Sequence, residues 1–168
     1  DILLELQAQK FVDKIGVSIY TAKELDAVAS VFSPDIIQVP YSVADRRLEL
    51  SGYIKDLKRA KIEIHARSIF LQGLLLIEKG AFPKRFLEIE DEIMLFRESA
   101  KDSGLSVLEA CIFTALRIKE FDKVLIGVTS ANEFIEIINS CSKFNMENEF
   151  PNLYLPLVPD NLLNPSNW

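Results

Sequence analysis

The spacing of apolar residues along the chain alternates between the period of a strand and the period of a helix. Short runs rich in β-branched residues predict strands over residues 15–19, 35–40, 62–67 and 124–128. Longer amphipathic segments predict helices over residues 1–14, 21–32, 51–58, 83–101, 106–118 and 130–142. A helix followed by four strand–helix units, with one extra helix after the third strand, indicates parallel strands joined by right-handed crossovers. The predicted fold class is therefore α/β.

One strand-to-helix pattern occurs near both ends of the chain, as KIGVSIYTAKEL at 14–25 and VLIGVTSANEF at 124–134. In each, an apolar run with a glycine precedes a hydroxyl residue that is followed three positions later by Glu. A hydroxyl residue and a Glu at this spacing form the capping box that begins a helix. The pattern predicts helix starts at Thr21, Ser106 and Ser130.

Four strand–helix units can form either an open doubly wound sheet or half of a (β/α)₈ barrel. The GxGxxG signal of nucleotide-binding open sheets is absent after the first strand. A complete barrel needs roughly 250 residues, and the chain has 168. The sequence favours half of a (β/α)₈ TIM barrel as a single domain over residues 1–168. Residues 145–168, which contain the proline-rich stretch PLVPDNLLNP, are predicted to form an irregular C-terminal extension.

Charge and cysteine content exclude several classes of partner. The formal net charge of −6 argues against binding to nucleic acid or to an anionic membrane, since both would repel the surface. Membrane helices need apolar runs of roughly 18 residues, which the sequence lacks. Cys111 and Cys141 have no metal-site or disulfide-framework spacing, so a cytoplasmic location is expected. Asp1 already falls inside a helical pattern, as expected for a sequence that begins partway through a longer protein.

Polar residues gather where the predicted strands end. In α/β folds ligands bind at the carboxyl ends of the strands, so these positions are candidate site residues. They are Ser18, Gln38, Ser68, Thr129 and Ser130. Within the third strand the alternating residues Glu63, His65 and Arg67 predict a polar face opposite Ile62, Ile64 and Ala66. We interpret this stripe as an ion-pair network rather than an acid–base pair.

Several stretches resemble the C-terminal half of the aldo-keto reductases, which are NADPH-dependent carbonyl reductases built on a (β/α)₈ barrel. The resemblance begins in the helix before the family's fifth strand and extends to the C-terminus. It is carried by IGVSIYTAKEL, QVPYSVADRRL, IEIHARSIFLQGLLL and IGVTSANEFIEI, with the closing LLNPSNW.

The resemblance implies a cofactor site that extends from the end of the first strand to the last helix. Ser18 and Gln38 would bind the nicotinamide carboxamide, with Arg67 beside the ring. The pyrophosphate would run along Arg67, Ser68, Phe70, Gln72, Gly73 and Leu74. The adenosine end would be lined by Gly127, Thr129, Ser130, Glu133 and Glu136, and the helix beginning at Ser130 would offer N–H groups to an anion.

The sequence departs from the family pattern at three places. Ile19 stands where the family usually has an Asn that would bind the carboxamide. VTSANEF contains no basic residue to bind a 2′-phosphate, so the resemblance leaves both NADP and NAD as expected cofactors. The family's catalytic Asp, Tyr, Lys and His belong to its first four strands, which this chain does not contain. Tyr20 and His65 lie on other strands, and we do not assign them the roles of the catalytic Tyr and His. Hydride transfer to a carbonyl needs an acid at the oxygen. The chain alone is expected to bind cofactor weakly and to be inactive.

Two interpretations therefore remain. The chain is the cofactor-binding half of an aldo-keto reductase, or it is a non-catalytic (βα)₄ half-barrel that acts as a binding or structural module. In either case the strands at 15–19 and 124–128 would be unpaired edges, which predicts a homo-oligomer. The substrate cannot be read from the sequence, although Phe70, Leu71, Tyr154 and Trp168 are candidates for its pocket.

Overall fold

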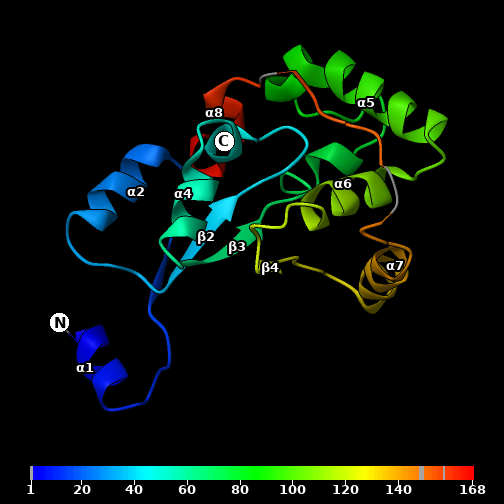
Figure 1. The fold of residues 1–168 in the computed structure, drawn as a ribbon. Helices are drawn as coiled ribbons and strands as arrows, with labels where there is room; N and C mark the ends of the chain where they lie inside the picture. Colours follow the sequence, from blue (N-terminus) through cyan, green and yellow to red (C-terminus); the bar gives the residue numbers. More distant parts are fainter. Residues whose placement is uncertain (1, 148–149, 157) are drawn as a thin grey trace.

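Four parallel strands form one sheet in chain order: β1 (Gly16–Ser18), β2 (Ile36–Pro40), β3 (Glu63–Arg67) and β4 (Lys123–Val124). The computed structural model describes residues 2–147, 150–156 and 158–168. Its α-helices are α1 (Ile2–Ala8), α2 (Ala22–Ala29), α3 (Arg47–Leu50), α4 (Tyr53–Arg59), α5 (Glu90–Asp102), α6 (Val107–Leu116), α7 (Ala131–Ser142) and α8 (Asp160–Leu163). Short 3₁₀ helices cover Leu74–Leu76 (η1), Lys84–Ile89 (η2) and Pro165–Asn167 (η3). This order confirms the predicted α/β half-barrel (Figure 1).

The two faces of the sheet differ in polarity because side chains alternate along each strand. Ile37, Val39, Ile64 and Ala66 have no exposed surface. They contribute to apolar clusters with residues of α2, α4, α6 and α7. Glu63, as the first residue of the predicted polar stripe, faces the opposite way and keeps part of its surface exposed. The sheet therefore has one face covered by helices and one polar face.

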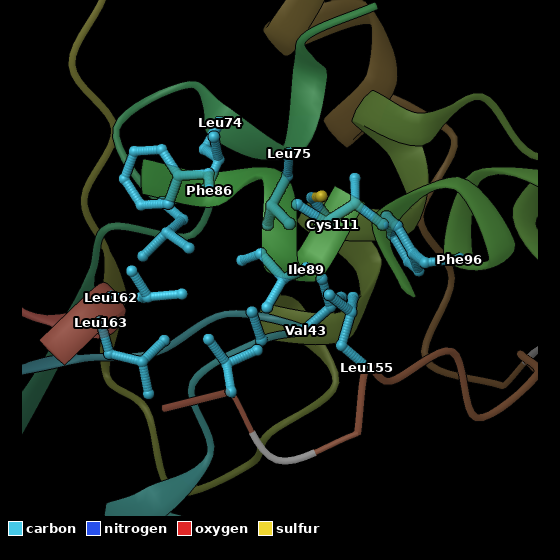
Figure 2. Packing of buried hydrophobic residues seen from close by; sticks show 14 of the residues in the cluster. Val43, Leu74, Leu75, Phe86, Ile89, Phe96, Cys111, Leu155, Leu162 and Leu163 are labelled. Atoms are coloured by element: carbon cyan, nitrogen blue, oxygen red, sulfur yellow. The ribbon is translucent and has the colours of Figure 1, made fainter. Parts of the chain in front are cut away.

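A third apolar cluster packs the loop after β3, η2 and α5 against the C-terminal segment. Figure 2 shows Leu74, Leu75, Phe86, Leu155 and Leu162 as members of this cluster. The cluster thus attaches the C-terminal segment to the body of the fold. Between α7 and Trp168 the described residues are irregular apart from α8 and η3. Asp1, and Asn148, Glu149 and Leu157 of the predicted extension, lie outside the described residues.

Two of the three predicted capping boxes are complete. Thr21 Oγ1 accepts from the N–H of Glu24 at 3.2 Å, and the Glu24 carboxylate accepts from the N–H of Thr21 at 3.1 Å. Ser106 and Glu109 exchange the same pair of bonds at 3.1 and 2.8 Å. These pairs satisfy N–H groups that have no partner within the helix.

Four predicted boundaries are wrong. The first helix ends at Ala8 rather than near residue 14, and the fourth strand pairs only over Lys123–Val124 rather than 124–128. Ser51 does not begin a helix, because Gly52, at φ +88°, is the N-cap of α4. The segment after Pro83 begins as the 3₁₀ helix η2 and becomes α-helical only at Glu90.

The first helix, α1, lies apart from the body of the fold (Figure 1). None of its residues is buried, and Ile2 is 73% exposed. The chain after it leaves Phe11 74% exposed. A hydrogen bond of 2.7 Å from Gln7 Nε2 to Asp35 Oδ2 connects α1 with the start of β2. Most of the apolar side of α1 is therefore exposed, and Leu6 alone among its leucines is partly buried.

None of the helices in the described part of the chain is long and apolar enough to cross a membrane.

The glycines of the two similar sequence patterns differ in their surroundings. A Cβ on Gly16 would lie 2.4 Å from the carbonyl oxygen of Ile36 and 2.7 Å from its Cβ, because β1 and β2 approach closely there. A Cβ on Gly127 would meet nothing within 4 Å.

We expect Gly16→Ala to lower the free energy of unfolding by about 1–3 kcal/mol, since backbone cannot yield as a side chain can. Gly127→Ala, the matched control, should change it by less than about 0.5 kcal/mol in urea unfolding. Equal effects would contradict the crowding at β1.

An ion pair joins the capping box of α6 to the end of α7. Lys143 Nζ lies 2.6 Å from Glu109 Oε1, and this ammonium, followed by the Ser106 N–H, holds the pKa of the Glu109 carboxyl below its usual range. The resulting stabilisation is present above the unfolded-state pKa of about 4.5 and is lost as pH falls through the lower folded-state value.

Glu109→Gln should therefore lower the free energy of unfolding at pH 7 by about 0.5–1 kcal/mol and flatten the decline of stability below pH about 4.5.

Urea unfolding at a series of pH values measures this effect. Glu24→Gln is the control, because Glu24 occupies the same box position in α2 and has no ion pair with the described residues. If both variants show the wild-type decline, the Lys143 pair does not contribute to the acid sensitivity.

Candidate functional site

A row of polar residues crosses the polar face of the sheet. Strand register places Ser18 beside Gln38, Gln38 beside His65, and His65 beside Lys123. Ser18 Oγ lies 3.3 Å from Gln38 Oε1, so the hydroxyl donates and the amide oxygen accepts. The amide nitrogen of Gln38 donates no hydrogen bond to the described residues, which leaves it available to a ligand.

The Arg67 guanidinium links the ends of β1 and β3. It donates from Nε to Ser18 Oγ at 3.0 Å and from a terminal nitrogen to the Ile19 carbonyl at 3.2 Å. A second terminal nitrogen lies 3.2 Å from Ser68 Oγ, and the guanidinium stacks 4.1 Å from the centre of the Tyr20 ring. Since these contacts come from three sides, the cation is held in place before any ligand arrives.

The loop after Arg67 has an unusual backbone. Ser68, Leu71 and Gln72 have φ values of 63°, 47° and 55°, and Gly73 follows at 85°. Each non-glycine residue in this region costs about 1–2 kcal/mol, and such strain is concentrated at functional sites. The loop is held by hydrogen bonds that the N–H groups of Leu71 and Gly73 donate at 2.8 and 3.0 Å. The N–H groups of its cleft-lining residues Phe70 and Gln72 donate none to the described residues.

The loop, the end of β3 and the start of α7 enclose a cleft of about 760 Å³. Ten of the thirteen predicted cofactor residues line it: Gln38, Arg67, Ser68, Phe70, Gln72, Gly73, Gly127, Thr129, Glu133 and Glu136. A volume of this size lies within the range of roughly 300–1,000 Å³ that is usual for ligand pockets. The structure thus brings residues from 38 to 136 to one place.

The three other predicted residues lie elsewhere. Ser18 contacts Gln38 and Arg67 next to the cleft. Leu74 is 3% exposed and belongs to the core cluster of Figure 2, so its side chain does not line the cleft. Ser130 caps α7, where its Oγ accepts from the N–H of Glu133 at 3.2 Å.

The predicted capping box at Ser130 is only half formed. The Glu133 carboxylate does not return to the N–H of Ser130; it accepts from Thr129 instead, from the N–H at 2.7 Å and from Oγ1 at 2.9 Å. The Thr129 N–H, and then its hydroxyl, lower the pKa of Glu133. The start of α7 therefore already holds a carboxylate where the sequence predicted an open anion site.

Two residues of the predicted polar stripe of β3, Glu63 and His65, belong to an ion-pair network, whereas Arg67 bonds Ser18, Ser68 and the Ile19 carbonyl instead. Glu63 contacts Lys14 Nζ through one oxygen, and the other lies 2.6 Å from His65 Nε2 and 3.5 Å from Lys123 Nζ. Lys14, followed by His65, lowers the pKa of Glu63 to about 2. A carboxylate that is so firmly ionised cannot act as a general acid near neutral pH.

The cysteines and the C-terminal aromatic residues have structural positions. Cys111 is 1% exposed, and burial raises the pKa of its thiol to about 12; Cys141 is partly buried, and both are free. Tyr154 lies under Arg46, whose guanidinium carbon is 3.4 Å from the ring centre, and Trp168 packs edge-on against Phe86 at 4.9 Å. These side chains, like Leu71 in the core, do not line the cleft.

Sequence reasoning missed the apolar part of the cleft. These lining residues are Ile69, Leu76, Leu108, Leu125, Ile126, Val128 and Ile137. Their residue types are those of a core, so no chemical signal sets them apart. The run at 125–128 was predicted as strand, but β4 ends at Val124 and leaves Leu125 36% and Val128 42% exposed.

Comparison with solved structures identifies the fold as half of an aldo-keto reductase barrel. Aldo-keto reductase AKR11C1 from Bacillus halodurans, in its holo form, superposes with a TM-score of 0.68 at 19% sequence identity, covering 87% of this chain and 48% of that one. The apo form gives the same score with 49% of its chain covered. The thermostable aldo-keto reductase Tm1743, in complex with the inhibitor epalrestat, gives 0.62 at 17% identity, covering 86% and 48%.

The chain spans about half the length of the aldo-keto reductases that it matches. At the level of sequence, no protein-family description matches the chain. No curated protein matches it either.

Proposed function

We propose that this chain is the cofactor-binding half of an aldo-keto reductase-type barrel and that its cleft binds NAD(H) or NADP(H). The observation that carries the proposal is the cleft itself, since residues chosen from sequence resemblance alone line one cavity of suitable size. When bound, the cofactor would supply the hydride for reduction of a carbonyl compound.

The chemistry of the cleft fits a nicotinamide dinucleotide. The unengaged Gln38 amide can pair with a carboxamide, and Ser18 orients it through a hydrogen bond. Arg67 provides a fixed positive charge, and the N–H groups of Phe70 and Gln72 are donors for pyrophosphate oxygens. The apolar residues on the other wall can cover a base or ring.

The proton donor for carbonyl reduction must come from outside this chain. The described residues lining the cleft include no Tyr, His or Lys. Tyr20 lies against the Arg67 guanidinium, and His65 is engaged by Glu63. Reduction by hydride transfer needs an acid held at the carbonyl oxygen. We therefore propose that the chain binds cofactor weakly and does not reduce carbonyl compounds alone.

Titration of the chain with NADH, followed by cofactor fluorescence, tests the site. Arg67→Met should weaken NADH binding about tenfold or more, because it removes a charged donor from the cleft. Arg59→Met is the control: that side chain is 78% exposed on α4 and pairs only with Asp56 among the described residues. Equal affinity in all three proteins, or no binding at millimolar NADH, would contradict the proposed site.

The second candidate function, a self-associating half-barrel, is favoured by the two edges of the sheet. β1 and β4 each pair on one side only. Exposed apolar residues flank both edge strands in the sequence: Ile2 and Phe11, before β1, are 73% and 74% exposed, and Phe134 and Ile138 on α7, after β4, are 53% and 50% exposed. Unpaired edges and apolar surface of this kind favour association. We propose that further strands cover these edges, either from a longer protein or from a second copy.

Sedimentation of the chain distinguishes these arrangements. A second copy would give a particle of at least twice the 19.1 kDa of one chain. Phe134→Glu should then shift the particle toward the monomer, whereas Leu87→Glu, at an equally exposed position on η2, should not. A stable monomer at all concentrations would contradict self-association.

We also propose a cytoplasmic location, because two free thiols persist most readily in a reducing compartment.

A further inference from the structure

We propose that the cleft takes NAD(H) in preference to NADP(H), because two carboxylates and no cation stand at the end formed by α7. This inference rests on the proposed function and specifies which of the two cofactors the same site accepts. It follows from how charge is distributed along the cleft and from the bonds that hold those charges.

The two ends of the cleft have opposite charge. Arg67 is the one cation among the described lining residues, and its bonds to Ser18 and to the Ile19 carbonyl fix it beside β1. Glu133 and Glu136 are the acids of the lining, and both belong to α7. They are three residues apart on one helix and therefore lie on the same side of it.

Two N–H groups at the start of α7 are not available to a second phosphate. The Thr129 N–H is taken by the Glu133 carboxylate at 2.7 Å, and the Glu133 N–H is taken by Ser130 Oγ at 3.2 Å. Because Thr129 also lowers the pKa of Glu133, this carboxylate stays ionised at neutral pH. A phosphate placed here would meet a fixed negative charge and the exposed Glu136, with no cation to balance its own charge.

The distribution of charge also determines which end of the dinucleotide lies at which end of the cleft. The carboxamide is drawn to Gln38 and the pyrophosphate to Arg67 and the neighbouring loop, so the adenosine ribose reaches toward α7. A free 2′-hydroxyl can donate to a carboxylate there, as acidic residues in dinucleotide sites do. A 2′-phosphate dianion would instead be repelled, which amounts to about tenfold in affinity even at the dielectric constant of water.

Calorimetric titration of the full chain with ADP-ribose and with its 2′-phosphorylated form tests the preference. These two ligands share the adenosine end and differ only in the phosphate at issue. We expect ADP-ribose to bind about tenfold more tightly. Glu136→Lys should bring the ratio to about one or reverse it, since the new ammonium can pair with the phosphate. Glu98→Lys, an exposed position on α5, is the matched control for net charge and should keep the wild-type ratio.

The outcomes separate the two proposals. Equal affinity, or tighter binding of the 2′-phosphorylated ligand, overturns the preference while leaving a dinucleotide site in place. A similar change of the ratio in both lysine variants also overturns it, because net charge rather than Glu136 would then be responsible. If neither ligand binds and NADH gives no fluorescence change, the proposed function fails and the preference fails with it.

Discussion

The parallel register between β2 and β3 is the constraint on which the rest of the structure depends. It pairs Ile37 with Ile64 and Val39 with Ala66, and these four fully buried residues seat the helices on one face. The same register brings Gln38 beside His65 on the other face. A slip of one residue would exchange the two faces, burying charges and exposing the core. Core packing and the arrangement of the polar face are therefore set by one pairing.

Local signals were enough to predict the order of the four strands and of the longer helices, but not the four-residue helices α3 and α8. The capping boxes at Thr21 and Ser106 and the alternation through β3 depend on neighbouring residues only, and the structure confirms them. The boundaries that failed depend on features that the spacing of apolar residues does not show. β4 pairs with β3 only over Lys123–Val124, and its outer side has no strand among the described residues. The start of α4 depends on the positive φ of Gly52, which no apolar spacing reveals.

The polar part of the cleft was predictable because its residues follow strands, where a parallel sheet gathers ligands. Its apolar part was not, because Ile126 and Ile137 have the composition of a core and become cleft residues only through packing. Glu133 shows a second limit. Its spacing from Ser130 is that of a capping box, yet its carboxylate bonds Thr129, and the choice between these neighbouring donors depends on backbone geometry.

The detached position of α1 bears on how the half-barrel can be completed. A closed ring of eight strand–helix units has one helix outside each junction between neighbouring strands. If two copies of this chain closed the ring, each junction between copies would receive α7 from one chain and α1 from the other, two helices for a single position. A different set of four strands need not bring this surplus. The symmetric ring could therefore close only if α1, none of whose residues is buried, stayed outside the junction.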